Sequence, residues 1–347
     1  MTTIGVIGLG RIGAFHTETL AGLPGIDGLV ITDERADVTA SVAAKHGARA
    51  VGSVEELLSS GVDGVVVAAA TPAHAELTLA SVQRGIPTFC EKPIASTAAE
   101  SARVAEIINR SGVPVQVGYQ RRFDAAFAAA KAAVDAGTLG TLHTVRSTTM
   151  DPAPPPMDYI KGSGGIFRDC AVHDFDIIRW ITGQNAVEVY ATGTVQGDPL
   201  FAEYGDVDSA AVVVRFDGGA LGVVSNARYN ARGYDCRLEV HGFADSVAAG
   251  WDHGVPLRNT DPRFADPSDF PSGPAHNFFM DRFTEAFRTE LAGFVEVAEG
   301  GPVRGATVAD AVEVAWLAEA ATESLRRGAP VALESVKESV TREVSHA

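Results

Sequence analysis

The stretch Ile4-Gly5-Val6-Ile7-Gly8-Leu9-Gly10-Arg11-Ile12-Gly13 decides the fold class of this chain. A buried strand is predicted over its first four residues, and a GxGxxG motif follows that strand directly. Here Gly8 permits a tight turn, Gly10 lets the backbone approach a pyrophosphate, and Gly13 lets the next helix pack closely on the strand. Free N–H groups at the start of that helix favour an anion. We therefore expect a dinucleotide site formed by Gly8, Leu9, Gly10, Arg11, Ile12 and Gly13.

The first third of the chain alternates short apolar runs with helix-like segments. Such a β-α-β rhythm predicts a parallel sheet with helices on both faces. Strands are expected at 4–7, 28–32, 65–70, 87–90 and 113–117, and helices at 13–21, 36–46, 73–84 and 97–109.

The pattern changes after Gly118. Period-two alternation and turn dipeptides now predict a mostly antiparallel sheet with a few helices. Strands are expected at 142–149, 186–192, 210–216, 220–225 and 236–241, and helices at 123–136, 278–299 and 307–326. A length of 347 residues also exceeds one typical core, so two domains are expected, 1–119 and 120–347.

Composition narrows the classes of partner. The net charge of −16 argues against a nucleic-acid backbone and an anionic membrane surface, and a neutral substrate fits it better. Three cysteines without a CxxC pair predict neither a disulfide framework nor a metal site. No basic leader precedes the glycine motif, and the apolar run 65–70 is too short to span a membrane. A cytoplasmic location is therefore expected.

Two further segments point to the cofactor. Asp33 lies twenty residues after Gly13 and could accept a hydrogen bond from a ribose 2′-hydroxyl, which favours NAD over NADP. Arg35 keeps the choice open, because a nearby arginine could bind a 2′-phosphate. Thr71-Pro72-Ala73-His74 follows a strand, where Thr71 and Pro72 suit a helix start. His74 then either faces the cofactor or is an exposed residue beside the cap.

Catalytic candidates occur in two places. Lys92, in Glu91-Lys92-Pro93 after a strand, could bind a substrate hydroxyl, although a surface turn lysine is the simpler alternative. Asp169, His173 and Asp176 are spaced by four and then three residues, so on one helix they would share a face. His173 is then the candidate general base. The alternative is a solvated acidic face beside a core histidine. With the glycine motif, these residues predict hydride transfer between a nicotinamide cofactor and an alcohol.

These motifs resemble the Gfo/Idh/MocA oxidoreductases. The resemblance rests on the GxGxxG at Gly8, on Glu91-Lys92-Pro93, and on Gly164-Gly165 followed by Asp169 and His173. Further stretches, including 120–124, 151–156, 159–165 and 233–240, resemble the inositol 2-dehydrogenase branch. The family implies an N-terminal Rossmann domain and a C-terminal α/β domain with a large, open, mostly antiparallel sheet.

The resemblance also implies roles for individual residues. Lys92, Asp169 and His173 would be catalytic, with Lys92 holding substrate and cofactor, His173 taking the hydroxyl proton and Asp169 supporting both. Glu91, Thr71, Pro72 and His74 would line the cofactor site, and Arg122, Asp151, Asp176 and Tyr234 would hold the polyol. A homo-oligomer, either dimer or tetramer, would form through the open sheet.

The expected reaction is the NAD-dependent oxidation of a ring hydroxyl of a cyclitol, with myo-inositol and its 2-keto product preferred. Met150 and the segment 226–232 depart from the branch pattern near the expected substrate pocket. Another inositol isomer, an aldose or an aminocyclitol therefore stays open as substrate. A non-catalytic nucleotide sensor is the alternative from another class, and such a protein would be expected to lose Lys92 or His173.

Overall fold

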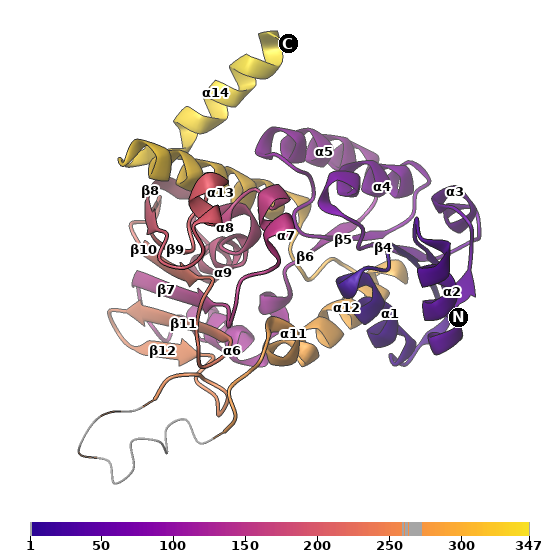
Figure 1. Ribbon diagram of the computed structural model, residues 1–347, viewed down its shortest axis with the longest axis horizontal. Helices are drawn as coiled ribbons and strands as arrows, with labels where there is room; N and C mark the ends of the chain where they lie inside the picture. Colours follow the sequence, from indigo (N-terminus) through magenta and orange to yellow (C-terminus); the bar gives the residue numbers. More distant parts are fainter. Residues whose placement is uncertain (1, 259, 261–262, 264–272, 347) are drawn as a thin grey trace. The chain divides into compact units, whose positions relative to one another are not determined.

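The computed structural model describes residues 2–258, 260, 263 and 273–346, which fold into two compact units (Figure 1). The first comprises Met1–Phe123 and Glu285–Ala315, and the second comprises Asp124–Thr284 and Trp316–Ala347. The expected C-terminal domain, 120–347, includes Glu285–Ala315, which the structure places in the first unit instead. Within the described residues, no helix combines the length and apolarity needed to cross a membrane.

The first unit is built on a six-stranded parallel sheet in the order β3-β2-β1-β4-β5-β6. This doubly wound order reverses direction between β1 and β4, where ligands bind at the carboxyl ends of the strands. The strands are β1 (Thr2–Ile7), β2 (Ile26–Thr32), β3 (Arg49–Ala50), β4 (Gly64–Val67), β5 (Thr88–Glu91) and β6 (Val115–Gly118). The five predicted strands and the parallel sheet are confirmed, and the two-residue β3 was missed.

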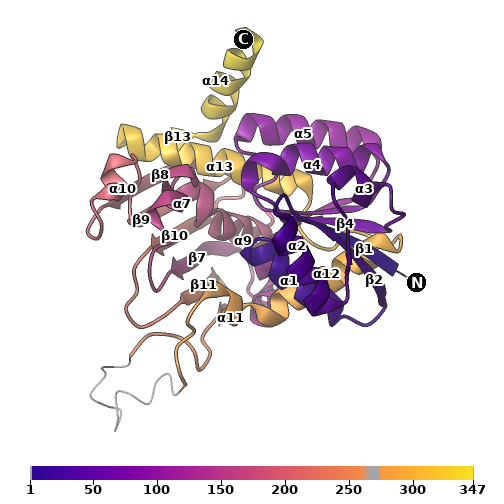
Figure 2. The same cartoon turned by 45° about the vertical axis from the view of Figure 1, so that its right-hand side comes forward.

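Helices cover both faces of this sheet, with α1 and α2 on one side and α4 and α5 on the other (Figure 2). The helices are α1 (Arg11–Ala21), α2 (Ala36–His46), α3 (Val54–Leu58), α4 (Thr71–Gln83) and α5 (Ala98–Ser111). Helix α3 was not predicted, and α4 begins two residues before its predicted start at 73.

The returning segment Glu285–Ala315 belongs to the first unit because its apolar side chains complete that core. The predicted single helix 278–299 is in fact two, α11 (Phe279–Arg282) and α12 (Thr284–Ala298). Leu291 and Phe294 of α12 are buried in one cluster with Ile4 and Phe89. The backbone of Ala306 then pairs with β6.

The second unit contains a seven-stranded sheet in the order β12-β11-β7-β10-β9-β8-β13. Among the described strands of this second sheet, only β7 and β10 pair in parallel, so the predicted mostly antiparallel sheet is confirmed. The strands are β7 (Leu142–Met150), β8 (Ala186–Thr194), β9 (Ser209–Phe216), β10 (Leu221–Ala227), β11 (Asp235–Gly242), β12 (Ser246–Ala249) and β13 (Val331–Ala332).

One face of this sheet is covered and the other is open. Along β9, Val212 and Val214 are fully buried, whereas Val213 between them is 42% exposed. Helix α9 packs on β7 and β10 on the covered side. The helices of this unit are α6 (Ala125–Asp135), α7 (Met157–Gly162), α8 (Ile166–Asp169), α9 (Val172–Thr182), α10 (Leu200–Glu203), α11, α13 (Val308–Arg327, whose first turns lie in the first unit) and α14 (Leu333–His346).

Candidate functional site

The three glycines of the motif serve different purposes. Gly8 has a φ of +89°, and a Cβ there would lie 2.5 Å from the Cα of Ala69, so this turn requires glycine. A Cβ on Gly13 would lie 1.9 Å from the carbonyl oxygen of Gly8. A Cβ on Gly10 would meet no described atom within 4 Å, and no side chain caps α1 among the described residues. Packing therefore demands Gly8 and Gly13, whereas Gly10 borders open space that suits a pyrophosphate.

Asp33, at the end of β2, is oriented by the glycine turn. Its Oδ2 accepts a hydrogen bond from the N–H of Leu9 (2.7 Å), and its Oδ1 accepts from the N–H (2.9 Å) and Nε (3.2 Å) of Arg35. Burial would raise the pKa of Asp33, but these hydrogen bonds outweigh it and lower the pKa. The charged carboxylate suits a ribose hydroxyl and repels a 2′-phosphate. Arg35 is an ion-pair partner of Asp33.

The start of α4 differs in detail from the prediction. Ala70 is the N-cap, so Thr71 and Pro72 occupy the first helical positions and Thr71 is not the cap. His74 is buried, and its two ring nitrogens lie 2.7 Å from the carbonyl oxygen of Pro93 and 2.9 Å from that of Ala69. The alternative of an exposed His74 is therefore wrong. Both ring nitrogens bind the protein's own backbone, and a place of His74 along the cofactor site stays a prediction.

The Glu91-Lys92-Pro93 turn follows β5 and contains a cis peptide bond before Pro93. The carboxylate of Glu91 binds inward, with Oε1 2.6 Å from Nε2 of His16 and Oε2 3.2 Å from the N–H of Lys92. Burial would raise the pKa of Glu91, but His16 and the nearby charges outweigh it and lower the pKa. The carboxylate of Glu91 is therefore engaged inside the protein, and a place of Glu91 along the cofactor site stays a prediction. Sequence reasoning missed His16, although it lies almost one helical turn after Gly13.

Arg122 also has a partner inside the first unit. It lies in a short 3₁₀ helix, Gln120–Phe123, and its Nη1 is 3.2 Å from Oδ2 of Asp310. Burial would raise the pKa of Asp310, but Arg122 and Thr307 outweigh it and lower the pKa. The guanidinium of Arg122, which was expected to hold the polyol, therefore forms an ion pair with Asp310 in this structure.

In the second unit, Asp169 and His173 do not share one regular helix. Asp169 is the last residue of α8, and His173 is the second residue of α9, with Cys170 and Ala171 forming a turn between them. The prediction of one helix carrying Asp169, His173 and Asp176 is therefore wrong at this break. Helix α9 still carries His173 and Asp176, of which His173 is half-buried and Asp176 is buried.

Asp169 and Asp151 share a buried arginine. Nη2 of Arg228 lies 2.8 Å from Oδ2 of Asp169, and its Nη1 lies 3.5 Å from Oδ2 of Asp151. Tyr159 donates its hydroxyl hydrogen to Oδ1 of Asp169 (2.8 Å). Arg228 is only 2% exposed, and although burial would lower its pKa, the negative charges around it raise the pKa. Arg228 lies in the segment 226–232 that matched no branch motif, so sequence reasoning missed it.

Asp174 fixes the helix that carries His173. This fully buried carboxylate accepts hydrogen bonds from Ser147 (2.5 Å) and Thr149 (2.8 Å) of β7 and from Asn226 (2.8 Å) of β10. Such a charge-assisted network is stronger than neutral hydrogen bonds and holds one geometry. The first turn of α9 is therefore tied to the middle of the sheet directly beside His173.

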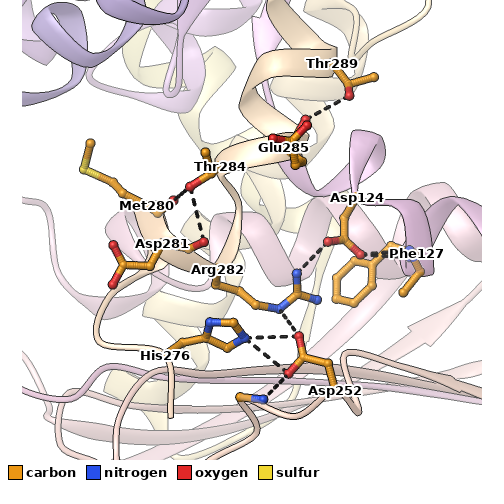
Figure 3. A network of polar contacts seen from close by, with 12 residues as sticks. Asp124, Phe127, Asp252, His276, Met280, Asp281, Arg282, Thr284, Glu285 and Thr289 are labelled. Carbon is orange, nitrogen blue, oxygen red and sulfur yellow. Dashed lines mark hydrogen bonds and ion pairs between the residues drawn. The ribbon is translucent and has the colours of Figure 1, made fainter. Parts of the chain in front are cut away.

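Figure 3 shows a polar network of Asp252, His276 and Arg282, and the backbone of Tyr234 binds one of its members. The N–H of Tyr234 donates to the carbonyl oxygen of His276 (2.7 Å), and Nε2 of His276 lies 3.1 Å from Oδ2 of Asp252. Arg282 joins the network, because its Nη1 donates to Oδ2 of Asp124 (2.6 Å) at the start of α6. Tyr234 itself is buried, and its role toward the polyol stays a prediction.

Two family models match this chain. One, described as an oxidoreductase family with an NAD-binding Rossmann fold, matches residues 2–119. The other, described as a GFO/IDH/MocA C-terminal domain, matches residues 127–248.

Similar proteins extend over nearly the whole chain. A myo-inositol 2-dehydrogenase of Thermotoga maritima is 38% identical over 96% of this chain and 99% of its own length. An NAD(+) scyllo-inositol 2-dehydrogenase of Bacillus subtilis is 35% identical, with 95% of each chain covered. The crystal structure of a myo-inositol dehydrogenase from Corynebacterium glutamicum is 36% identical and superposes with a TM-score of 0.87, covering 96% of this chain and 99% of its own.

Alanine substitutions at Gly10 and at Gly13 should change different properties, the first NAD binding and the second stability. Gly10→Ala places a methyl group in open space, so the thermal midpoint should stay unchanged while NAD binding weakens by about tenfold, or 1.4 kcal/mol. Gly13→Ala forces Cβ against the Gly8 carbonyl and should lower the thermal midpoint. Thermal unfolding and calorimetric NAD titration measure both effects. Unchanged NAD affinity in Gly10→Ala would contradict the assignment of the cradle.

Arg228→Gln should leave two carboxylates without their buried cation. We expect the free energy of unfolding at pH 7 to fall by about 3–5 kcal/mol. Urea unfolding at pH 7 measures this loss. Arg215→Gln is the control, because Arg215 forms an exposed pair with Glu188 and should cost about 1 kcal/mol or less. Equal losses of unfolding free energy in the two variants would refute the role of Arg228 as the buried partner of Asp169 and Asp151.

Proposed function

Because the chain belongs to the Gfo/Idh/MocA family of oxidoreductases, we propose that it oxidises a ring hydroxyl of a cyclitol with NAD, converting myo-inositol to its 2-keto product. Two features of the chain carry the proposal. The glycine turn Gly8–Gly13 has open space at Gly10 and lies beside the charged Asp33. The half-buried His173 lies on a helix that is tied to its sheet. The names of the relatives at 35–38% identity support the substrate class.

The chain's own residues fit NAD. The turn Gly8–Gly13 and the uncapped start of α1 would hold the pyrophosphate, and Asp33 would accept from the adenosine ribose. The start of α4, with Thr71 and Pro72, would border the same edge of the sheet. When bound, NAD supplies the hydride acceptor for the carbinol carbon.

Three residues are proposed as catalytic. Lys92 would donate a hydrogen bond to the reacting hydroxyl and favour its ionisation. His173 would remove the hydroxyl proton as general base, since an imidazole titrates near neutral pH. Asp169, held by Arg228 and Tyr159, would keep a negative charge near the imidazole that gains the proton.

The remaining polar candidates would bind the other hydroxyls of the ring. Asp151, Asp176, Tyr234 and Arg122 are proposed for this role, because carboxylates accept hydrogen bonds from hydroxyls, a guanidinium donates to them and a phenol does both. Met150, which ends β7 directly before Asp151, and Asn226–Arg232 are the positions that would select among substrates.

Substrate specificity is tested with a panel of inositol isomers, an aminocyclitol and common aldoses, each with NAD and with NADP. We expect the fastest reduction of NAD with myo-inositol. His173→Ala should abolish turnover and leave calorimetric NAD binding nearly intact, whereas His143→Ala, an exposed histidine of β7, should be fully active.

The other outcomes distinguish the alternatives. Activity on scyllo-inositol or a sugar alone would retain the mechanism and change the substrate. Tight NAD binding without turnover of any polyol would favour a nucleotide sensor, and full activity in His173→Ala would refute the assigned base.

We also propose a homo-oligomer and a cytoplasmic location. The open face of the second unit's sheet exposes Tyr190, Val213 and Leu221 on three adjacent strands, and such apolar patches mark interfaces. The three free, buried cysteines suit a reducing compartment.

Light scattering should give two or four times the mass of one chain. Val213→Glu should shift this mass toward the monomer, because it buries a charge in the interface. Arg110→Glu, a charge change on the exposed side of α5, is the control and should not change the mass. A monomeric wild type would refute the interface.

A further inference from the structure

We infer that two buried histidines, His16 and His74, are positioning residues that bind the Glu91-Lys92-Pro93 turn at both of its ends and thereby set the place of Lys92. This inference rests on the proposed role of Lys92. Neither histidine is assigned to hold substrate or to exchange the proton of the reaction.

His16 binds the first residue of the turn. Its side chain is fully buried, its ring lies 5.7 Å from the rings of Phe89 and Phe287, and its Nε2 is 2.6 Å from Oε1 of Glu91. The other carboxylate oxygen accepts from the N–H of Lys92. Nδ1 of His16 has no hydrogen-bond partner among the described residues, so this environment favours the tautomer with hydrogen on Nε2. Helix α1 therefore reaches the backbone of Lys92 through one carboxylate.

His74 binds the last residue of the turn. Its Nδ1 is 2.7 Å from the carbonyl oxygen of Pro93, and its Nε2 is 2.9 Å from that of Ala69. A carbonyl only accepts, so both ring nitrogens must donate and the ring is an imidazolium. Burial would lower the pKa of His74, but Cys90 and the two carbonyls outweigh it and raise the pKa to about 9. Helix α4 therefore grips the turn through a buried cation.

The two contacts connect the turn to the helices that begin at the cofactor edge of the sheet. Helix α1 follows its N-cap residue Gly10 after β1, and α4 follows its N-cap residue Ala70 after β4. The same Ala69 that accepts from His74 lies against Gly8. A displacement of either helix start is thus transmitted to Lys92 through hydrogen bonds of 2.6–2.9 Å.

Stability alone does not explain this arrangement. Apolar side chains of similar volume usually replace buried charged groups without loss of stability. A buried imidazolium whose two donors meet two separate loops fixes the distance between those loops, which an apolar side chain cannot do.

The test exchanges each histidine for asparagine and for glutamine. The asparagine amide overlays the Nδ1 position of histidine, and the glutamine amide overlays the Nε2 position. At position 74 the turn is bound by Nδ1, so His74→Asn should retain activity and His74→Gln should lose it. At position 16 the turn is bound by Nε2, so His16→Gln should retain activity and His16→Asn should lose it. The inference therefore predicts that the asparagine variant is the more active one at position 74 and the glutamine variant at position 16.

We expect kcat for myo-inositol to fall by about tenfold or more in His74→Gln and His16→Asn, and by less than about threefold in the other two variants. NAD affinity by calorimetry should stay within about threefold in all four. A primary deuterium isotope effect should increase in the two impaired variants, because poor placement of Lys92 slows the chemical step. Gln116→Leu is the control: it removes a buried donor from the carbonyl of Glu290 in the same unit, its side chain makes no hydrogen bond to the turn among the described residues, and it should lower only the thermal midpoint.

Two results would overturn the inference. The first is that kcat and the isotope effect simply follow the thermal midpoints of the variants and the control, and do not show the opposite preferences for asparagine and glutamine at the two positions. The other is a neutral His74 ring in ¹⁵N NMR of the wild type at pH 7.5, a measurement that needs no turnover. Absence of turnover in the wild type would instead refute the proposed function, so the two failures are distinguishable.

Discussion

The contact between Gly8 and Ala69 is the constraint on which the first unit's functional edge depends. A Cβ on Gly8 would collide with the backbone of Ala69, so β1 and β4 approach at the switch point only because position 8 is glycine. Both sides of this contact continue into the site. The Gly8 carbonyl lies against Gly13 at the start of α1, and the Ala69 carbonyl accepts from His74. The position of the glycine turn and that of the Lys92 turn therefore both depend on the contact between Gly8 and Ala69.

The second unit solves its own positioning problem with buried carboxylates. Asp174 ties the start of α9 to β7 and β10, and Asp169 is held by Arg228. Each carboxylate has several charge-assisted donors, which compensates for the cost of its burial. The half-buried His173 is the residue before Asp174, so the helical turn that carries the residue proposed to move the proton is fixed to the sheet.

Sequence patterns predicted what depends on local periodicity and failed where distant segments meet. The β-α rhythm and the glycine motif were sufficient for the parallel sheet, its cradle and Asp33, because these features are encoded within neighbouring residues. The return of α12 to the first core depends on contacts between Phe294 and Ile4, which no local pattern reveals. The break after Asp169 escaped because helical spacing continues through it. Arg228 was missed because one arginine in an irregular segment acquires meaning only from the carboxylates around it.

The net charge of −16 raises the question of how such a chain holds an anionic dinucleotide. Charges more than about 8–10 Å away are largely screened at physiological salt, so the local field decides. At the cofactor edge that field comes from backbone: among the described residues no side chain caps α1, and the first N–H groups of this helix form the positive end of a helix dipole. The imidazolium that we infer for His74 adds a buried cation at the start of α4, and salt screens a buried charge much less than an exposed one. An acidic protein can thus keep its surface charge and still present a positive site, provided that the positive groups are held by the backbone or buried beneath it.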